Sequence, residues 1–371
     1  MHTLGEYISI KHGFAFKGDS ITTEDNGVVL VTPGNFAIGG GFKEDKCKFF
    51  NADYPSEFIL HPGDLIVTMT DLSKEIDTLG YSALVPQSDR TYLHNQRIGL
   101  VQIKSKELDK QYLYWFMRTK EYQRTIAGTS SGTTVHHTSP KRICDVELTI
   151  PTLKRQRSIA EFLNVIEDKI AINHQINKNL KDQAQAIYVD MFITNADPSW
   201  PLGHLSDLIT VRYGKDHKKL NDGPFPVYGS GGIMRYVERP IYEKESVLIP
   251  RKGTLNNVMY VNVPFWSVDT MFFTEMKVPN VAKYVFHFVK NKDLALLNAG
   301  SAVPSMTTDI LNAMELNIPD SVTLQKFENI VGTMYGTIQH NNEESKKLST
   351  LRDSLLPRLM SGEIDVSNLD I

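Results

Sequence analysis

The sequence has little of what stabilises secreted or membrane proteins. Its 371 residues contain two cysteines, Cys47 and Cys144, which lie far apart and outside any CxxC spacing. This excludes a disulfide framework and a cysteine-based zinc site, so both thiols are expected to be reduced. No apolar run approaches the roughly 20 residues that span a bilayer. The first residues also lack the basic and then apolar segments of a secretory signal. We expect a cytoplasmic protein with no membrane partner.

The sequence also lacks the excess of positive charge that is typical of nucleic-acid-binding proteins. It has 40 Lys and Arg against 43 Asp and Glu, a formal net charge of −3. This argues mildly against nucleic acid, but phosphate binding depends on local charge, which an average over the chain does not show. A basic face balanced by acidic surface elsewhere, or a basic partner, is compatible with this value.

Catalytic motifs are missing as well. The sequence contains no GxGxxG after a strand, no GxxxxGK[ST], no HExxH, no HxE…CxxC and no Pro-Pro-Tyr type of methyltransferase motif. The adjacent His136 and His137 would point to opposite faces of a strand, which is unsuitable for a shared metal. Asp71, Asp77 and Asp269 are interpreted as capping or turn residues. We therefore predict no catalytic residue, no metal and no cofactor on this chain.

A duplication is present. Residues 132–151 (GTTVHHTSPKRICDVELTIP) match residues 300–319 (GSAVPSMTTDILNAMELNIP) at an offset of 168, and the match continues downstream. Upstream, Leu4-Gly5 resembles Leu202-Gly203 at an offset of 198. The second copy therefore lacks about 30 residues from its middle. Such a pattern indicates a common frame that carries two different inserts.

The first part of each copy favours a mixed α+β globule. Short β-type runs separated by Gly, Pro and Asn occur at residues 28–31, 64–68 and 98–103 in the first copy, and at 246–249 and 257–261 in the second. Short helices are expected at 109–126 and 279–298.

The second part of each copy predicts a long helix. Apolar residues recur in steps of three and four from Lys154 to Phe192 and again from about Thr323. Pro357 should end or kink the second helix. The two seams predict an antiparallel, coiled-coil pair related by a pseudo-twofold axis. The expected divisions are a first globule at 1–153, a central spacer helix at 154–196, a second globule at 197–321, and a C-terminal spacer helix and tail at 322–371.

Asn173 lies at the middle of the first helix, on the seam side, and its repeat mate Asn341 lies at the middle of the second. We hypothesise that the two side chains pair and fix the helix register, as a buried asparagine does in coiled coils. The alternative is that both asparagines face solvent.

Candidate DNA-binding residues occur in both copies. Amide and guanidinium groups pair with adenine and guanine edges, and hydroxyl-rich loops with glycines approach phosphates. Each stretch alone is an ordinary solvated loop, but such stretches recur in both globules. The candidates are Lys17, Asn95, Gln96, Arg97, Ser130, Ser131, Thr133, Thr134, His136, His137 and Lys141 in the first copy, and Arg212, Tyr213, Lys215, Lys218, Ser230, Arg251, Lys252, Thr254, Asn256 and Asn257 in the second.

Over nearly its whole length the chain resembles the specificity subunit of type I restriction-modification systems. The most distinctive segment is 351–364 (LRDSLLPRLMSGEI), which is similar to that family's C-terminal helix and tail. Four further segments resemble recurring sequence motifs of that family's recognition domains. They are 63–70 (GDLIVTMT), 93–99 (LHNQRIG), 248–254 (LIPRKGT) and 265–270 (FWSVDT).

The resemblance implies a bacterial or archaeal, DNA-associated protein with two target recognition domains, each reading half of a bipartite double-stranded DNA target. It further implies helices that set the half-site spacing and dock two methyltransferase (modification) subunits. S-adenosylmethionine, ATP and Mg would then belong to those partners and to a restriction/translocase subunit. The alternatives are a self-sufficient DNA methyltransferase or nuclease with an unrecognised site, and a two-headed protein-interaction adaptor.

Overall fold

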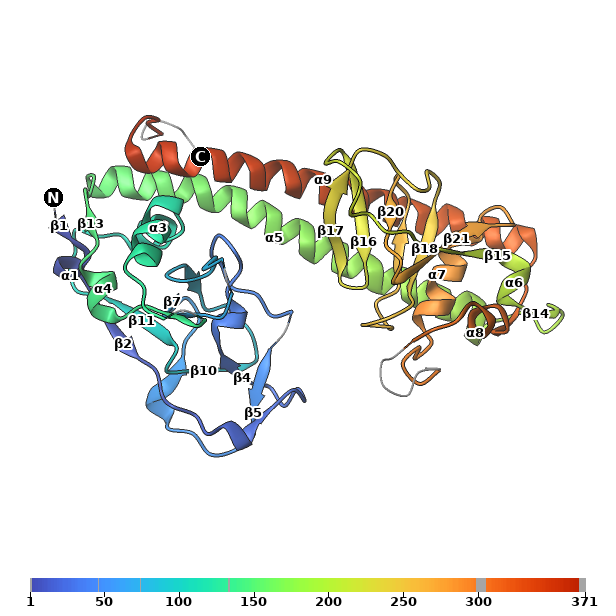
Figure 1. The fold of residues 1–371 in the computed structure, drawn as a ribbon, viewed down its shortest axis with the longest axis horizontal. Helices are drawn as coiled ribbons and strands as arrows, with labels where there is room; N and C mark the ends of the chain where they lie inside the picture. The colour runs from blue at the N-terminus through green and yellow to red at the C-terminus, as the bar shows by residue number, and fades with distance from the viewer. Residues whose placement is uncertain (1, 46, 74, 133, 298–304, 367–371) are drawn as a thin grey trace. The chain divides into compact units, whose positions relative to one another are not determined.

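The computed structural model describes residues 2–45, 47–73, 75–132, 134–297 and 305–366 (Figure 1). The chain forms two compact units: Met1–Ala171 with Glu344–Ile371, and Ile172–Glu343. Each unit contains one α+β globule and a part of both long helices. The long helices are α5, Leu153–Val189, which continues as a π-helical turn at Asp190–Thr194, and α9, Ser321–Ser361.

The globule of the first unit is built on an antiparallel sheet of order β2-β11-β7-β9. A second sheet, β3-β5-β4-β10-β6, contains one parallel pair, β4 with β10. Two short pairs, β1-β13 and β12-β8, complete it. The elements are β1 His2–Thr3, α1 Leu4–Tyr7, β2 Ile8–His12, β3 Ile21–Thr22, β4 Val28–Val31, β5 Lys48–Phe50, β6 Ile59–Leu60, β7 Leu65–Thr68, β8 Thr70–Asp71, β9 Ser82–Leu84, β10 Thr91–His94, β11 Ile98–Ile103, α2 Lys110–Phe116, α3 Lys120–Gly128, β12 His136–His137, α4 Pro140–Cys144 and β13 Glu147–Leu148, with 3-10 turns at Gly18–Ser20, Pro33–Asn35 and Ser56–Phe58.

The globule of the second unit repeats this frame. Its antiparallel sheet has the order β15-β21-β18-β19, and its second sheet, β17-β16-β20, contains the parallel pair β16 with β20. The elements are β14 Leu202–His204, α6 Leu205–Leu208, β15 Ile209–Tyr213, β16 Phe225–Gly229, β17 Gly232–Val237, β18 Ser246–Pro250, β19 Met259–Val261, β20 Trp266–Ser267, β21 Met271–Met276, α7 Ala282–Lys290, α8 Thr308–Asn312 and β22 Glu315–Asn317.

Main-chain hydrogen bonds correct the predicted start of the repeat. The Leu4 N–H donates to Val146 O (2.9 Å), and the Leu205 N–H donates to Met314 O (2.8 Å). Leu4 thus corresponds to Leu205, an offset of 201 rather than 198. The offset at the end of the copies is still 168, so the second copy is 33 residues shorter. The Leu-Gly pair at residue 202 misled the sequence comparison because it lies three residues before the true equivalent.

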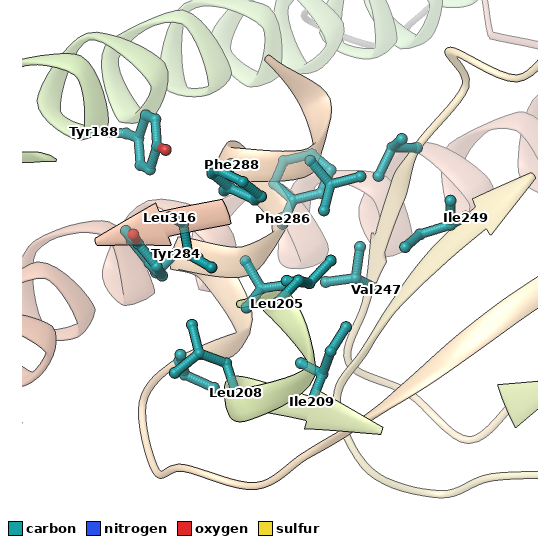
Figure 2. Packing of buried hydrophobic residues seen from close by; sticks show 14 of the residues in the cluster. Tyr188, Leu205, Leu208, Ile209, Val247, Ile249, Tyr284, Phe286, Phe288 and Leu316 are labelled. Atoms are coloured by element: carbon teal, nitrogen blue, oxygen red, sulfur yellow. The ribbon is translucent and has the colours of Figure 1, made fainter. Parts of the chain in front are cut away.

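The core of the second unit joins α7 to the sheet and to the long helices. Tyr284, Phe286 and Phe288 of α7 lie between Tyr188 of α5 and side chains of α6 and β18 (Figure 2). Nearly every residue of α7 is buried, as expected of a helix covered on both sides. The corresponding core of the first unit packs α2, α3 and α1 against Leu163 of α5 and Leu359 of α9.

Three predicted helix limits differ in the structure. Pro357, which was predicted to end or kink the second long helix, does not end α9, which continues to Ser361. The missing N–H removes one hydrogen bond, whereas Leu356 and Leu359 anchor the last turns in the first core. The helix predicted at 109–126 is divided into α2 and α3, because Thr119 caps a new helix by accepting from Tyr122 N. The helix predicted at 279–298 is shorter, Ala282–Lys290, and residue 298 lies outside the described residues.

Within the first unit α5 and α9 are antiparallel. Arg155 Nη2 donates to Gly362 O (3.2 Å), Glu167 accepts from Arg352 (2.6 Å), and Lys169 pairs with Glu344 (3.3 Å). Residue numbers therefore rise along one helix as they fall along the other.

Candidate nucleic-acid interface

Four segments of the first unit meet at one end of its strands. Phe14 N donates to His94 O (2.8 Å), and Gln96 N donates to Phe14 O (2.9 Å). Met69 N donates to Arg97 O (2.9 Å), and Thr138 N donates to Met69 O (3.0 Å). These main-chain bonds join the loop after β2, the turn between β10 and β11, the end of β7 and the end of β12. We name this surface the first edge; it comprises residues 12–17, 69–71, 95–97 and, as far as they are described, 130–138.

Equivalent bonds build a second edge in the second unit. Lys215 N donates to Ser267 O (2.8 Å), Arg251 N donates to Thr270 O (2.9 Å), and Met306 N donates to Arg251 O (2.9 Å). The second edge comprises residues 213–219, 229–232, 251–257, 268–270 and 305–306.

Both edges require a glycine at the same place. A Cβ on Gly13 would clash with the Asn95 carbonyl oxygen, and a Cβ on Gly214 would clash with the Val268 carbonyl oxygen. Gly13 and Gly214 thus allow the loop after the first long strand to pass against the neighbouring turn in either unit.

The predicted Asn95-Gln96-Arg97 stretch is a tight turn. The Asn95 side chain is buried and accepts a hydrogen bond from Arg97 N (3.0 Å), which shapes the turn. Gln96 and Arg97 are exposed. Two of the three predicted side chains are therefore exposed, and the third stabilises the turn that carries them.

Main-chain hydrogen bonds join the two sides of the predicted hydroxyl-rich loop. Ser131 and His137 exchange main-chain hydrogen bonds (2.8 and 3.0 Å), and Gly132 between them has a φ of +106°, which favours glycine. Arg142 Nη1 donates to Ser131 Oγ (3.1 Å) and to His137 O (3.3 Å). Arg142 is a clamp that the predicted set of residues omits. Ser130 is half-buried, Thr134 is exposed, and Thr133 lies outside the described residues.

The histidine pair lies on β12, which pairs with β8. His137 shares a hydrogen bond with Thr70 Oγ1 (3.1 Å) through Nδ1, while His136 occupies the next strand position. Lys141, on α4, forms an exposed ion pair with Asp145 (2.6 Å). Lys17 is exposed at the start of the 3-10 turn that follows β2.

Asp71 has the predicted turn role. Its buried carboxylate accepts from Ser73 N (2.6 Å), Leu79 N (3.0 Å) and both the N–H and the hydroxyl of Thr78 (2.6 and 2.7 Å). Burial alone would raise the pKa of Asp71, but these hydrogen bonds outweigh it, and the pKa is lowered. The carboxylate organises the loop between β8 and β9. No group of three or more His, Cys, Asp or Glu side chains suited to a metal occurs among the described residues.

On the second edge, Arg251 connects two predicted segments. Its guanidinium lies over the Tyr213 ring (5.3 Å) and donates to Asp269 O (3.2 Å). Arg212 points to a different partner, Glu275, in an ion pair of 3.0 Å. Lys215 and Lys218 are exposed beside Tyr213 in the sequence.

The loop after β18 combines fixed and exposed residues. Asn257 Nδ2 donates to Ser230 O (2.8 Å), which joins this loop to the turn between β16 and β17. Asn256 is structural, because its side chain donates to Asp293 (3.0 Å) and accepts from Ala295 N (3.1 Å). Lys252 and Thr254 are exposed.

The two predicted register residues are both buried, Asn173 fully and Asn341 at 7% exposure. The alternative that both face solvent is therefore wrong. Asn341 Nδ2 donates to Asn177 Oδ1 (2.9 Å), and Asn177 Nδ2 donates to Asn342 Oδ1 (2.9 Å). Asn177 was not predicted, because the apolar periodicity of one helix does not show which residues of the other helix its side chains contact. The pairing of Asn173 with Asn341 stays a prediction.

Comparison with known proteins identifies the family. A family model described as the type I restriction modification DNA specificity domain matches residues 1–182 and 199–349. The type I restriction enzyme MjaIX specificity subunit of Methanocaldococcus jannaschii is 20% identical over 70% of this chain and 70% of its own length. A putative type I specificity subunit of Mycoplasma pneumoniae is 25% identical over 76% of this chain and 80% of its own length.

A solved structure shows the same fold. The type I restriction-modification S subunit from M. genitalium superimposes with a TM-score of 0.60 at 19% identity, covering 97% of this chain and 95% of the other. None of the helices in the described ranges has the length and apolar character needed to span a membrane. The chain belongs to the type I restriction-modification DNA specificity family, as a DNA-recognition subunit and not an enzyme.

Proposed function

We propose that the first and second edges each read one half of a bipartite double-stranded DNA target. The observation that carries this proposal is that one hydrogen-bonded frame recurs in both units and presents different side chains at equivalent places. The turn 95–97 carries Gln96 and Arg97, whereas its equivalent, 268–270, carries Asp269. A frame with interchangeable side chains suits recognition of two different half-sites.

The side chains fit the chemistry of DNA. Arg97 and Gln96 match guanine and adenine edges, and Thr254 and Ser131 match phosphates. Lys17, Arg97, Lys215 and Lys252 are exposed, and none of them forms an ion pair with a carboxylate of the described residues. Local positive charge at the edges is compatible with the net charge of −3.

The long helices are proposed to set the gap between half-sites and to dock partners. In this division, target recognition domains at 1–153 and 197–321 are connected by spacer helices at 154–196 and 322–371. Half-sites read from one face of DNA lie about one helical turn, ~34–36 Å, apart. The asparagine contacts of Asn341 support a fixed register, because buried amides pair in only one alignment of two helices.

The proposed partners are two modification subunits, which would supply S-adenosylmethionine and the methyl transfer. A restriction subunit would add ATP and Mg in the full complex. The chain would act at the DNA of a bacterial or archaeal cytoplasm.

The test is reconstitution with the modification subunits of the same system. The complex should methylate a bipartite sequence and lose DNA affinity steeply as salt rises. The chain alone, with labelled S-adenosylmethionine or with Mg, should show no turnover. Turnover by the chain alone would establish the enzyme alternative, and DNA affinity independent of salt would favour the adaptor.

A further inference from the structure

A hairpin of the second unit exposes two consecutive aliphatic side chains. Strands β16 and β17 are joined at Gly229 and Gly232, and Ile233 and Met234 follow with exposures of 51% and 61%. Tyr228 pairs with Ile233, but Val227 pairs with Arg235, so Met234 is the extra residue of a β-bulge. Bulges redirect side chains and are frequent beside binding sites. In a regular strand two consecutive side chains point to opposite faces of the sheet, so only one of the two would be exposed where the other face is covered.

The hairpin turn is part of the second edge. Strand β16 is parallel to β20, so both strands end at the same side of their sheet. Val268 N donates to Tyr228 O (3.1 Å), and Asn257 binds Ser230 O. A Cβ on Gly229 would lie 2.5 Å from Met234 Sδ and 3.8 Å from a Val268 methyl carbon. Met234 is therefore packed beside the turn 268–270.

The first unit has an exposed aliphatic residue, Ile38, in the loop after β4, the strand that corresponds to β16. Strand β4 is parallel to β10, and the loop after β4 lies at the end that leads into Asn95. Phe36 and Phe42 bridge the base of this loop, and Ile38 between them is 72% exposed.

We propose that Ile233 and Met234 contact the 5-methyl groups of thymine in the major groove of the second half-site. The thymine methyl is the apolar group that the bases present in the major groove. The cations Arg251, Lys252 and Lys215 on the same edge favour DNA over an apolar protein partner. This inference rests on the proposed function and makes the two side chains determinants of sequence specificity.

Uracil-for-thymine substitution tests the contact, because it removes the methyl group and keeps base pairing. The target is first read by sequencing DNA methylated by the complex. Duplexes with uracil in the second half-site should bind the complex about fourfold more weakly for each contacted methyl. The double variant Ile233→Ala, Met234→Ala should bind thymine and uracil duplexes equally. Leu202→Ala, which truncates another exposed aliphatic residue of this unit, should keep the wild-type sensitivity.

Equal binding of thymine and uracil duplexes by the wild-type complex would overturn the inference, as would a second half-site without thymine. A double variant that loses assembly with the modification subunits, but whose remaining complex keeps its uracil sensitivity, would assign the hairpin to a protein interface instead. Replacing whole base pairs in the second half-site distinguishes a failure of this inference from a failure of the proposed function. If such replacements have no effect, the proposed function itself fails.

Discussion

The two units share their first sheet and differ in their second. Within the described residues, both first sheets have four strands in equivalent order, whereas the second sheet has five strands in the first unit and three in the second. Three main-chain bonds of the first edge nevertheless have a counterpart at the second edge. The difference of 33 residues therefore falls outside the frame, in the hairpins and loops around it. The frame positions the proposed reading surface, and the inserts differ between the two units.

The units also differ in how the globule contacts the long helices. In the first unit Arg118 is buried, lies over Trp115 (4.4 Å) and pairs with Glu167 of α5 (3.4 Å), which also binds Arg352 of α9. In the second unit the buried His287 binds Gln185 of α5 (2.8 Å) and Tyr335 of α9 (3.1 Å). The first contact depends on charge and the second on a neutral imidazole, although Lys283 of the second globule also forms an ion pair with Glu328 of α9 (2.6 Å).

Breaking the charged contact should have the largest effect. Burial tends to raise the pKa of Glu167, but Arg118 and Arg352 outweigh it and lower the pKa. Glu167→Gln leaves Arg118 buried without its carboxylate and should destabilise the first unit by about 3 kcal/mol. Hydrogen exchange should show the loss in the first unit and not in the second. Glu161→Gln, at an exposed site of the same helix, is the control. Equal exchange in the two variants would contradict a structural role for this ion pair.

Arg97→Ala should weaken DNA binding by about 2 kcal/mol if the guanidinium reads a base. The complex is assayed on duplexes altered in one half-site at a time, with Arg124→Ala on α3 as the control. A loss confined to one half-site identifies a base contact, and a uniform loss identifies a phosphate contact. Unchanged binding would remove Arg97 from the first edge.

Acid should weaken the second unit through His287. Burial, followed by the charge of Lys290, lowers the pKa of His287 to about 4. The unfolded chain, with a pKa near 6.5, therefore binds the proton first. The contribution of neutral His287 to the free energy of unfolding is complete above pH ~6.5. It is lost as the pH falls towards 4, at a rate approaching about 1.4 kcal/mol per pH unit. His287→Gln should flatten the fall in hydrogen-exchange protection of the second unit. The same acid response in the variant would show that another group is responsible.

Lys141→Ala should have the smallest effect, under about 1 kcal/mol, because its exposed side chain is already paired with Asp145. Arg142→Ala should weaken binding more, since Arg142 holds the loop from Ser131 to His137. Affinity measured over a series of salt concentrations compares the two. A larger loss of DNA affinity in Lys141→Ala than in Arg142→Ala would mean that a phosphate contact of Lys141 matters more than the conformation of the loop.

The sequence predicted those features that depend on periodicity or composition. The duplication, the long helices and the strands at residues 28–31 and 98–103 follow from local patterns, and the structure contains them. The carboxylate of Asp71, at the end of β8, has the predicted capping or turn role.

Features that depend on distant partners could not be predicted. Asn256 is a chemically plausible base reader, yet Asp293 and Ala295 occupy its amide. The roles of Asn177 and Arg142 could be recognised only from the contacts that their side chains make in the folded structure. Pro357 remains helical because tertiary packing outweighs a local preference.

The most direct test of two independent reading domains is a domain replacement. Residues 202–318 are replaced by the corresponding domain of a related specificity subunit, and the methylated DNA of a host carrying the chain and its partners is sequenced. We predict a bipartite motif whose second half alone changes, while the first half and the gap stay as in the wild type. A change in both halves, or a continuous motif, would contradict the account.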